Sequence, residues 1–281
     1  MQAFPEFVHM PPAFWAMVKY ISEHLGYTIR GEGVVRSYSI DEIKQLISRD
    51  GMNLPSDTIL LFVKSYFDER AKLLNQFVRR NLMDVETAKE KYQKLYSIYQ
   101  KNRFACKIPM NKQKGAMKQI AYFTAIINIL TEATIRYSPI YNGSLGFNDD
   151  PRGLAYVFDN ENCIIGASSR RFDGAYPNII NPRIVWEIKE YYYATTFGSR
   201  VADGVYETQL DGYEFRDISY HSGRPITHVF FLDGYKTWWI DGKSYLCRII
   251  DILNLGLVDE VIVGKEVFNR WPELLSSILV E

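Results

Sequence analysis

The sequence is poor in the residues that build disulfides and soft-metal sites. Its 281 residues include only three cysteines and four histidines. Cys106, Cys163 and Cys247 form neither a CxxC pair nor a Cys/His spacing typical of zinc sites. This pattern excludes a disulfide framework, argues against a zinc centre and predicts a reducing compartment.

The sequence also lacks an excess of charge and a long apolar run. Lysine plus arginine and aspartate plus glutamate both total 33, so any binding to a polyanion must come from local clusters of basic residues. The N-terminal residues lack the basic start and apolar centre of a signal peptide, and the apolar stretch near residues 121–130 is too short to span a bilayer. We therefore expect a soluble, cytoplasmic protein without membrane contacts. No phosphate-binding or dinucleotide-binding glycine motif is present either.

The sequence pattern changes at about residue 140, from apolar residues at helical spacing to short strand-like runs. Residues 11–27, 39–51, 55–82, 84–103 and 114–137 show apolar residues at helical spacing, with Ser39 and Asp84 as candidate N-caps. From about residue 140, short strand-like runs at 154–159, 163–173, 183–193 and 227–234 follow, then further helices and a strand at 258–264. We expect an α/β (α+β) fold, with a helical region over residues 1–110 and a catalytic core over residues 111–281.

The run RIVWEIK, residues 183–189, contains the chemically most informative pattern. Strand side chains alternate between faces, so Trp186 and Ile188 would share one face, and Glu187 and Lys189 the other. Asp173 lies shortly upstream. Two converging carboxylates bind Mg²⁺, which prefers oxygen ligands, and a neighbouring lysine can orient the attacking water and stabilise the transition state of phosphodiester hydrolysis.

These residues resemble the PD-(D/E)xK nuclease superfamily, which includes most type II restriction endonucleases. The resemblance covers roughly residues 115–265 and places the metal-binding acids on Asp173 and Glu187 and the lysine on Lys189. Phe172 stands where the family motif has proline. The resemblance implies a restriction-endonuclease-like core with a central mixed β-sheet flanked by helices, Mg²⁺ (or Mn²⁺) as cofactor, and a homodimer acting on double-stranded DNA.

Further candidate residues lie around this motif. Glu132 could add a helix carboxylate to the metal site, although an ion pair with Arg136 at i+4 is the simpler role for it. Gln209 and Tyr213 are similar to a Q-x-x-x-Y element of one branch of the superfamily. The candidates for DNA contacts are Arg170, Arg171, Lys112, Lys114, Lys118, Gln209 and Tyr213. The basic run at 101–119 is alternatively a solvated loop between helices. Asp149, Asp150 and Asp159 are weaker candidates for the upstream acid.

The leading hypothesis is therefore a Mg²⁺-dependent, site-specific endonuclease of the restriction type. A catalytically inactive nucleic-acid-binding module with a nuclease-like fold is the main alternative, and an acid/base pair acting on a sugar is a third. DNA or RNA as substrate, the recognition sequence, and a role in restriction, other defence or repair all remain open at this level.

Overall fold

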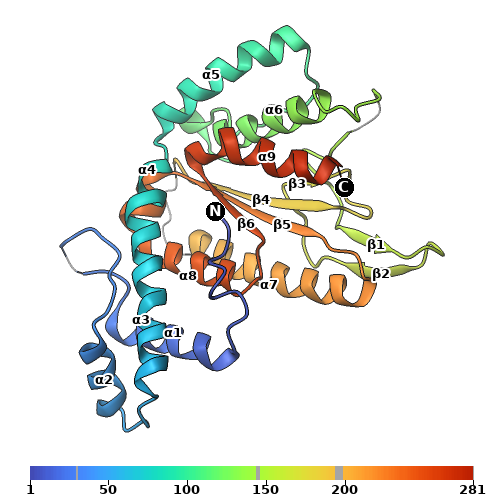
Figure 1. Cartoon of the computed structure of the whole chain (residues 1–281). Coiled ribbons are helices and arrows are strands. Elements are labelled where there is room, and N and C mark those ends of the chain that lie inside the picture. The colour runs from blue at the N-terminus through green and yellow to red at the C-terminus, as the bar shows by residue number, and fades with distance from the viewer. Residues whose placement is uncertain (30, 144–145, 194–198, 281) are drawn as a thin grey trace.

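The computed structural model describes residues 1–29, 31–143, 146–193 and 199–280 and shows a mixed α/β fold (Figure 1). A four-stranded sheet lies at the centre, with α-helices on both of its faces, and a group of N-terminal helices extends from one side. The prediction of a mixed sheet flanked by helices, preceded by a helical region, is confirmed.

The N-terminal helices form where the sequence provides caps. They are α1 (Pro12–Leu25), α2 (Ile40–Arg49) and α3 (Asp57–Lys72), and α3 continues through a π-helical stretch at Leu73–Val78 into α4 (Arg79–Asn81). Ser39 and Glu42 form a capping box at the start of α2, as the predicted N-cap implies. The three long helices enclose their own aromatic-rich cluster, which includes Phe14, Trp15 and Tyr66.

The central sheet has the strand order β3-β4-β5-β6. Its strands are β3 (Gly174–Tyr176), β4 (Ile184–Glu190), β5 (Thr227–Asp233) and β6 (Glu260–Val263). β3 pairs antiparallel with β4, whereas β4–β5 and β5–β6 are parallel. The parallel pairs are joined by α7 (Ser199–Ser222) and by α8 (Lys243–Asn254), the helical crossovers that parallel strands require.

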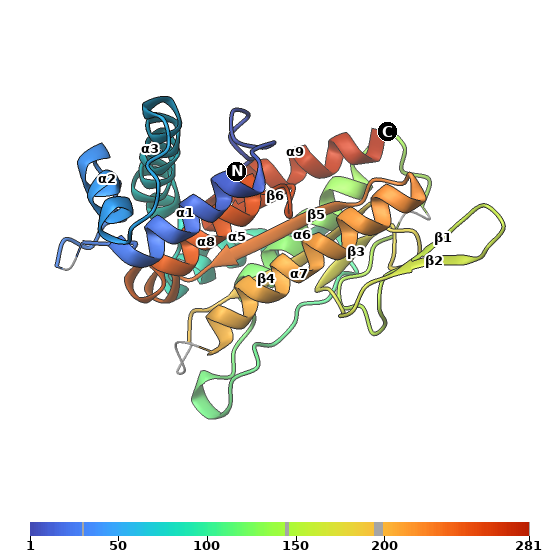
Figure 2. The same cartoon turned by 90° about the horizontal axis from the view of Figure 1, so that it is seen from below.

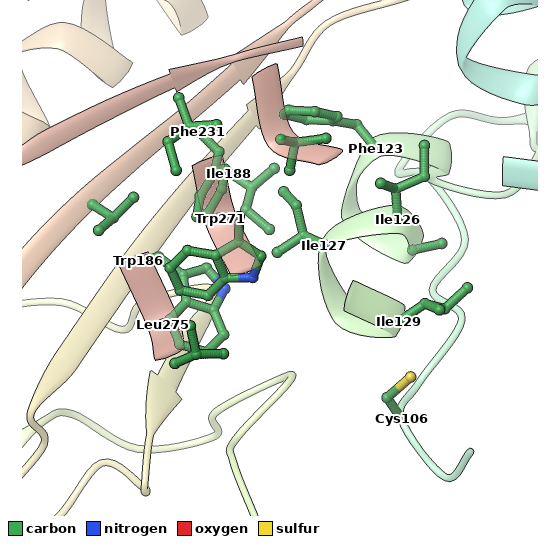
Figure 3. Packing of buried hydrophobic residues seen from close by; sticks show 14 of the residues in the cluster. Cys106, Phe123, Ile126, Ile127, Ile129, Trp186, Ile188, Phe231, Trp271 and Leu275 are labelled. Atoms are coloured by element: carbon green, nitrogen blue, oxygen red, sulfur yellow. The ribbon is translucent and has the colours of Figure 1, made fainter. Parts of the chain in front are cut away.

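Helices cover the two faces of the sheet with separate apolar clusters. On one face, α5 (Val85–Asn102), α6 (Tyr122–Arg136) and α9 (Val267–Val280) pack against Trp186, Ile188 and Phe231 (Figure 3). On the other face, α7 and α8 contact Phe230 and other residues of β5 and β6 (Figure 2). β4 therefore passes between two layers, and its two sets of alternating side chains meet different helices.

Three local predictions were wrong. The expected strand at 163–173 is shorter, since β2 (Ile164–Ala167) pairs with β1 (Tyr156–Phe158) in a separate hairpin, and Asp173 instead precedes β3. The helix expected from residue 114 begins at Tyr122, after a 3₁₀ turn at Gly115–Met117. The helix expected at 199–215 continues to Ser222, where Gly223 follows with φ +65.

The division of the chain at residue 110 stays a prediction. α5 precedes this position, and it packs with α6 in the cluster under the sheet. In the described part of the chain, no helix is long and apolar enough to cross a bilayer.

Candidate functional site

Asp173 is fixed to β4 on both sides of Glu187. Its backbone N–H donates to the Trp186 carbonyl at 3.0 Å, and its carboxylate oxygen Oδ2 accepts from the Ile188 N–H at 2.7 Å. The next residue is Gly174, where a Cβ would lie 2.0 Å from the Trp186 indole. Asp173 can approach β4 this closely because the glycine leaves room for the buried ring.

Phe172 is buried directly before Asp173 and fixes the position of this segment by its packing. The ring is buried and lies 5.2 Å from the Phe215 ring and 5.9 Å from the His228 ring. It is part of an apolar cluster between the β1–β2 hairpin, β4 and the end of α7. Phenylalanine at the position where the family motif has proline therefore holds the turn through aromatic packing.

Glu187 and Lys189 lie on the α7 face of β4, as the strand alternation predicts. The Lys189 ammonium donates to Glu187 Oε1 at 2.6 Å and to Glu207 Oε2 on α7 at 3.0 Å. Gly204 faces the lysine stem, and a Cβ there would be 3.1 Å from Lys189 Cε. The lysine is thereby held between the strand and the helix.

Arg170 connects the same acids from the loop before β3. Its guanidinium donates to Glu187 Oε1 and to Asp211 Oδ2, each at 2.8 Å, and lies 3.2 Å from Glu207 Oε2. We call Arg170, Glu187, Lys189, Glu207 and Asp211 the acid–base cluster. Asp173, directly before β3, is hydrogen-bonded to β4 beside this cluster. Only Glu207 and Arg170 give the cluster substantial exposure to solvent.

The charges in this site are unevenly balanced. Burial opposes the ionisation of Glu187, but Lys189 and Arg170 outweigh it and keep its pKa below the usual value. Burial raises the pKa of Asp211 to about 7, against the opposing effect of Arg170. Burial, with a contribution from the Glu187 carboxylate, raises the pKa of Asp173 to about 7. One carboxylate is thus firmly ionised, while two neighbouring acids are partly protonated near neutral pH.

Two buried carboxylate oxygens lack a hydrogen-bond partner among the described residues. They are Glu187 Oε2 and Asp211 Oδ1. A buried acceptor without a donor is costly, and a hard cation with oxygen ligands would satisfy it. The unpartnered oxygen of Glu187 therefore fits a Mg²⁺ ion by donor chemistry, and Asp173 offers a second carboxylate near it. Within the ranges described, however, no three acids, histidines or cysteines form a ready group that could hold a metal.

Glu132 does not join this site. Its carboxylate accepts from the N–H groups of Ala105 and Cys106 at 2.7–2.9 Å and pairs with Arg136. The simpler role, an ion pair within the helix, is the one that the structure shows. α6 also covers the Trp186 face of the sheet, opposite to Glu187.

Gln209 and Tyr213 lie on α7 but face away from the cluster. Residues two apart on a helix point roughly 200° from each other, so Gln209 and Tyr213 are turned from Glu207 and Asp211. The Tyr213 ring is exposed and lies under the Arg216 guanidinium at 5.0 Å. Their predicted contact with DNA stays a prediction.

The predicted basic residues differ in their surroundings. Arg170 turns inward to three acids, whereas Arg171 is exposed. Lys112, Lys114 and Lys118 are exposed around the 3₁₀ turn that precedes α6. The charge of Lys112 also lowers the pKa of Asp173, so this loop passes near the candidate site.

The alternative upstream acids have structural roles. Asp159 accepts from the Glu161 and Cys163 N–H groups in the turn of the β1–β2 hairpin. Asp149 accepts from the Lys107 N–H, and Asp150 pairs with Arg152. None of these contacts reaches Glu187.

The sequence reasoning did not identify Glu207 and Asp211. Their spacing of four residues places both on one face of a helix. Gly204, three residues before Glu207, lies on the same face and marks a close approach to another element. That stripe of small and acidic residues could have indicated a polar helix face against the Glu-x-Lys strand.

Family models match two consecutive parts of the chain. Residues 1–77 match the domain of unknown function DUF7690, and residues 83–278 match the domain of unknown function DUF7687. No curated protein and no solved structure matches the chain. Because the second match covers more than half of the sequence and contains the whole acid–base cluster, the chain belongs to the DUF7687 family.

Proposed function

We propose that the chain is a Mg²⁺-dependent endonuclease that hydrolyses phosphodiester bonds of double-stranded DNA. The proposal includes a site-specific, restriction-type activity and a cytoplasmic homodimer. The observation that carries it is the geometry at β4. Asp173 is bonded to the backbone on both sides of Glu187, and the Lys189 ammonium lies 2.6 Å from the Glu187 carboxylate.

Each of these three residues has a chemical role in the proposal. Asp173 and Glu187 would hold the metal through their carboxylate oxygens. When bound, the ion supplies a more acidic water and neutralises charge that builds on the phosphate. Lys189 is kept protonated, because the Glu187 carboxylate raises its pKa against the lowering effect of burial. A fixed ammonium at this position can orient a water and stabilise negative charge in the transition state.

Arg170 and Asp211 support this arrangement as positioning residues. Asp211 is buried and binds one end of the Arg170 guanidinium, whose other end binds Glu187. The guanidinium therefore fixes the direction of the Glu187 carboxylate. Such outer contacts determine how well ligands are preorganised for a metal ion.

The order of elements also supports the proposal. An acid before β3, Glu-x-Lys on β4, helix α7 and the parallel strand β5 follow one another in the order that the resemblance to the PD-(D/E)xK superfamily implies. The polar side chains of β4, Glu187 and Lys189, face α7, and the apolar side chains Trp186 and Ile188 face α6 and α9.

A nucleic-acid-binding module without catalysis is the second candidate. It is favoured by the neutralisation of Glu187, whose Oε1 already binds both Lys189 and Arg170. In such a module the acid–base cluster would be a structural ion-pair network. Cleavage of DNA in Mg²⁺ separates the two candidates.

The experiment is incubation of the full chain with long, unmethylated duplex DNA and Mg²⁺, followed by sizing of the products. Discrete fragments that vanish in excess EDTA support the site-specific endonuclease. A smear that vanishes in EDTA supports a non-specific nuclease. DNA that stays intact in Mg²⁺ and in Mn²⁺, while the protein still binds it, supports the inactive module.

A further inference from the structure

A cavity lies at the start of β4, away from the acid–base cluster. It measures about 410 Å³ and is bounded by residues at the starts of β4 and β5, after the end of α7, in β1 and in the last turns of α9. Its size falls within the range of small-molecule sites, which is about 300–1,000 Å³. Arg183 at its wall is four residues from Glu187, a separation of roughly 13 Å along an extended strand.

Two arginines line this cavity. They are Arg183, directly before β4, and Arg224, directly before β5. Thr227 and Asn181 add polar groups to the wall, and the residues that line the cavity include no aspartate or glutamate. The cavity therefore carries two full positive charges and no opposing carboxylate in its lining.

Neither guanidinium is neutralised by an acid in the described part of the chain. The ion pairs there include neither Arg183 nor Arg224, and the Arg224 guanidinium donates to the uncharged Asn160 Oδ1 at 2.9 Å. The carbonyl groups at the end of α7 contribute a partial negative charge of about one half, which two arginine charges outweigh. The cavity wall therefore has a net positive charge that a bound anion would neutralise.

The rest of the wall is apolar. Ile226 and Ile278 are buried residues that line the cavity, together with Val157 and two prolines. An inorganic anion alone would leave this surface without a partner. A molecule with both an anionic group and an apolar body would contact all parts of the wall.

We propose that this cavity binds a small molecule that carries a phosphate group on an apolar or aromatic body. Guanidinium groups bind phosphate through paired N–H donors, which gives them an advantage over lysine for this anion. The proposal is independent of nuclease activity, because no residue of the acid–base cluster lines the cavity.

The test is calorimetric titration of the full chain with phenyl phosphate and with inorganic phosphate at constant ionic strength. Wild type should bind phenyl phosphate saturably at one site, and more tightly than inorganic phosphate. Arg183→Gln and Arg224→Gln should each weaken binding about tenfold or more, because each removes charge-assisted hydrogen bonds. Arg224→Lys, which keeps the charge but loses the paired donors, should fall between.

Arg152→Gln is the matched control, since Arg152 is an exposed arginine outside the cavity. It should bind phenyl phosphate like wild type. The proposal is overturned if wild type shows no saturable binding at millimolar phenyl phosphate, or if the cavity variants bind as well as the control. It is also overturned if the two glutamine variants bind a short DNA duplex more weakly than wild type but bind phenyl phosphate as tightly as wild type.

Discussion

In the acid–base cluster, burial has more influence on the pKa of the Asp211 carboxyl than the arginine in contact with it. Asp211 is fully buried on α7, and its Oδ2 binds Arg170 while Oδ1 has no hydrogen-bond partner among the described residues. Burial accordingly raises its pKa to about 7 although an arginine is in contact with it. Arg170 therefore offsets only part of the desolvation cost of the ionised Asp211 carboxylate.

This raised pKa predicts a pH dependence of stability. The unfolded carboxyl ionises near pH 4, whereas the folded one ionises near 7, so the folded state holds the proton more strongly in between. The contribution is fully present below about pH 4 and is lost as the pH rises through 7. The unfolding free energy of wild type, relative to Asp211→Asn, should therefore decrease by up to about 4 kcal/mol over this interval and level off above it.

Urea unfolding at a series of pH values measures this difference. Asp203→Asn serves as control, because Asp203 is an exposed acid on the same helix. Its difference from wild type should stay nearly constant with pH. A difference for Asp211→Asn that is flat, or that increases with pH, would show that Arg170 dominates over burial.

At the scale of elements, the site depends on one strand and one helix in contact. β4 presents Glu187 and Lys189, and α7 presents Glu207 and Asp211 against them. Strand alternation was sufficient to predict the first pair, because it is a local property of the backbone. For the second pair, spacing indicates only a polar stripe on α7, and the contact of that stripe with β4 is a property of the tertiary packing.

The loop that carries Lys112, Lys114 and Lys118 is the element that we expect to contact the DNA backbone. All three lysines are exposed, and Lys112 is near enough to lower the pKa of Asp173. Replacement of all three by glutamine should weaken DNA binding. It should also reduce the slope of log affinity against log salt by about 0.9 for each phosphate contact that is lost.

Fluorescence titration with a short duplex at several salt concentrations gives this slope. A triple variant of equal charge change provides the comparison, with exposed or half-exposed lysines at other places in the fold: Lys44, Lys72 and Lys94. An equal loss of slope in both triple variants would mean that the loop contributes only to overall charge and makes no specific contact with DNA.

In the whole molecule, a buried ion pair joins the N-terminal helices to the core. Arg70 on α3 is completely buried and donates to both carboxylate oxygens of Asp251 on α8 at 3.0 and 3.1 Å. Tyr66 donates to the same carboxylate, and Ser22 on α1 accepts from Arg70. The parts that match two different family models are thus connected by a polar network without access to solvent.

Arg70→Met should destabilise the chain strongly. Removal of one partner leaves the Asp251 carboxylate buried and uncompensated, which costs about 3–5 kcal/mol. Lys72→Met breaks an exposed pair with Glu69 on the same helix and should cost no more than about 0.5 kcal/mol. Denaturant unfolding of both variants checks this, and similar stability of the two would show that α3 is not anchored through Arg70.

The sequence allowed the architecture to be predicted more completely than the site. Caps such as Ser39 and Asp84 are local, and both N-caps are present as predicted. The division between the β1–β2 hairpin and the central sheet was not predicted, because strand pairing over long separations depends on packing that periodicity does not report. Glu132 was assigned too close to the metal for the same reason, since the face of α6 that contacts the sheet is a tertiary property.

In the proposed function, Glu187 belongs to a metal-dependent phosphodiesterase site. The most direct test compares the DNA cleavage rate of wild type and Glu187→Gln in Mg²⁺, with EDTA as the metal-free reference. The substitution keeps size and hydrogen bonding but removes the charge that a metal requires. Wild type should cleave only with Mg²⁺, and Glu187→Gln should be slower by about 10²-fold or more with unchanged DNA affinity. The rates are compared at a temperature where both proteins are folded, because Lys189 and Arg170 lose a buried anionic partner and the melting temperature of the variant falls. Cleavage by wild type in excess EDTA, or an equal rate in the variant, would show that Glu187 holds no catalytic metal ion.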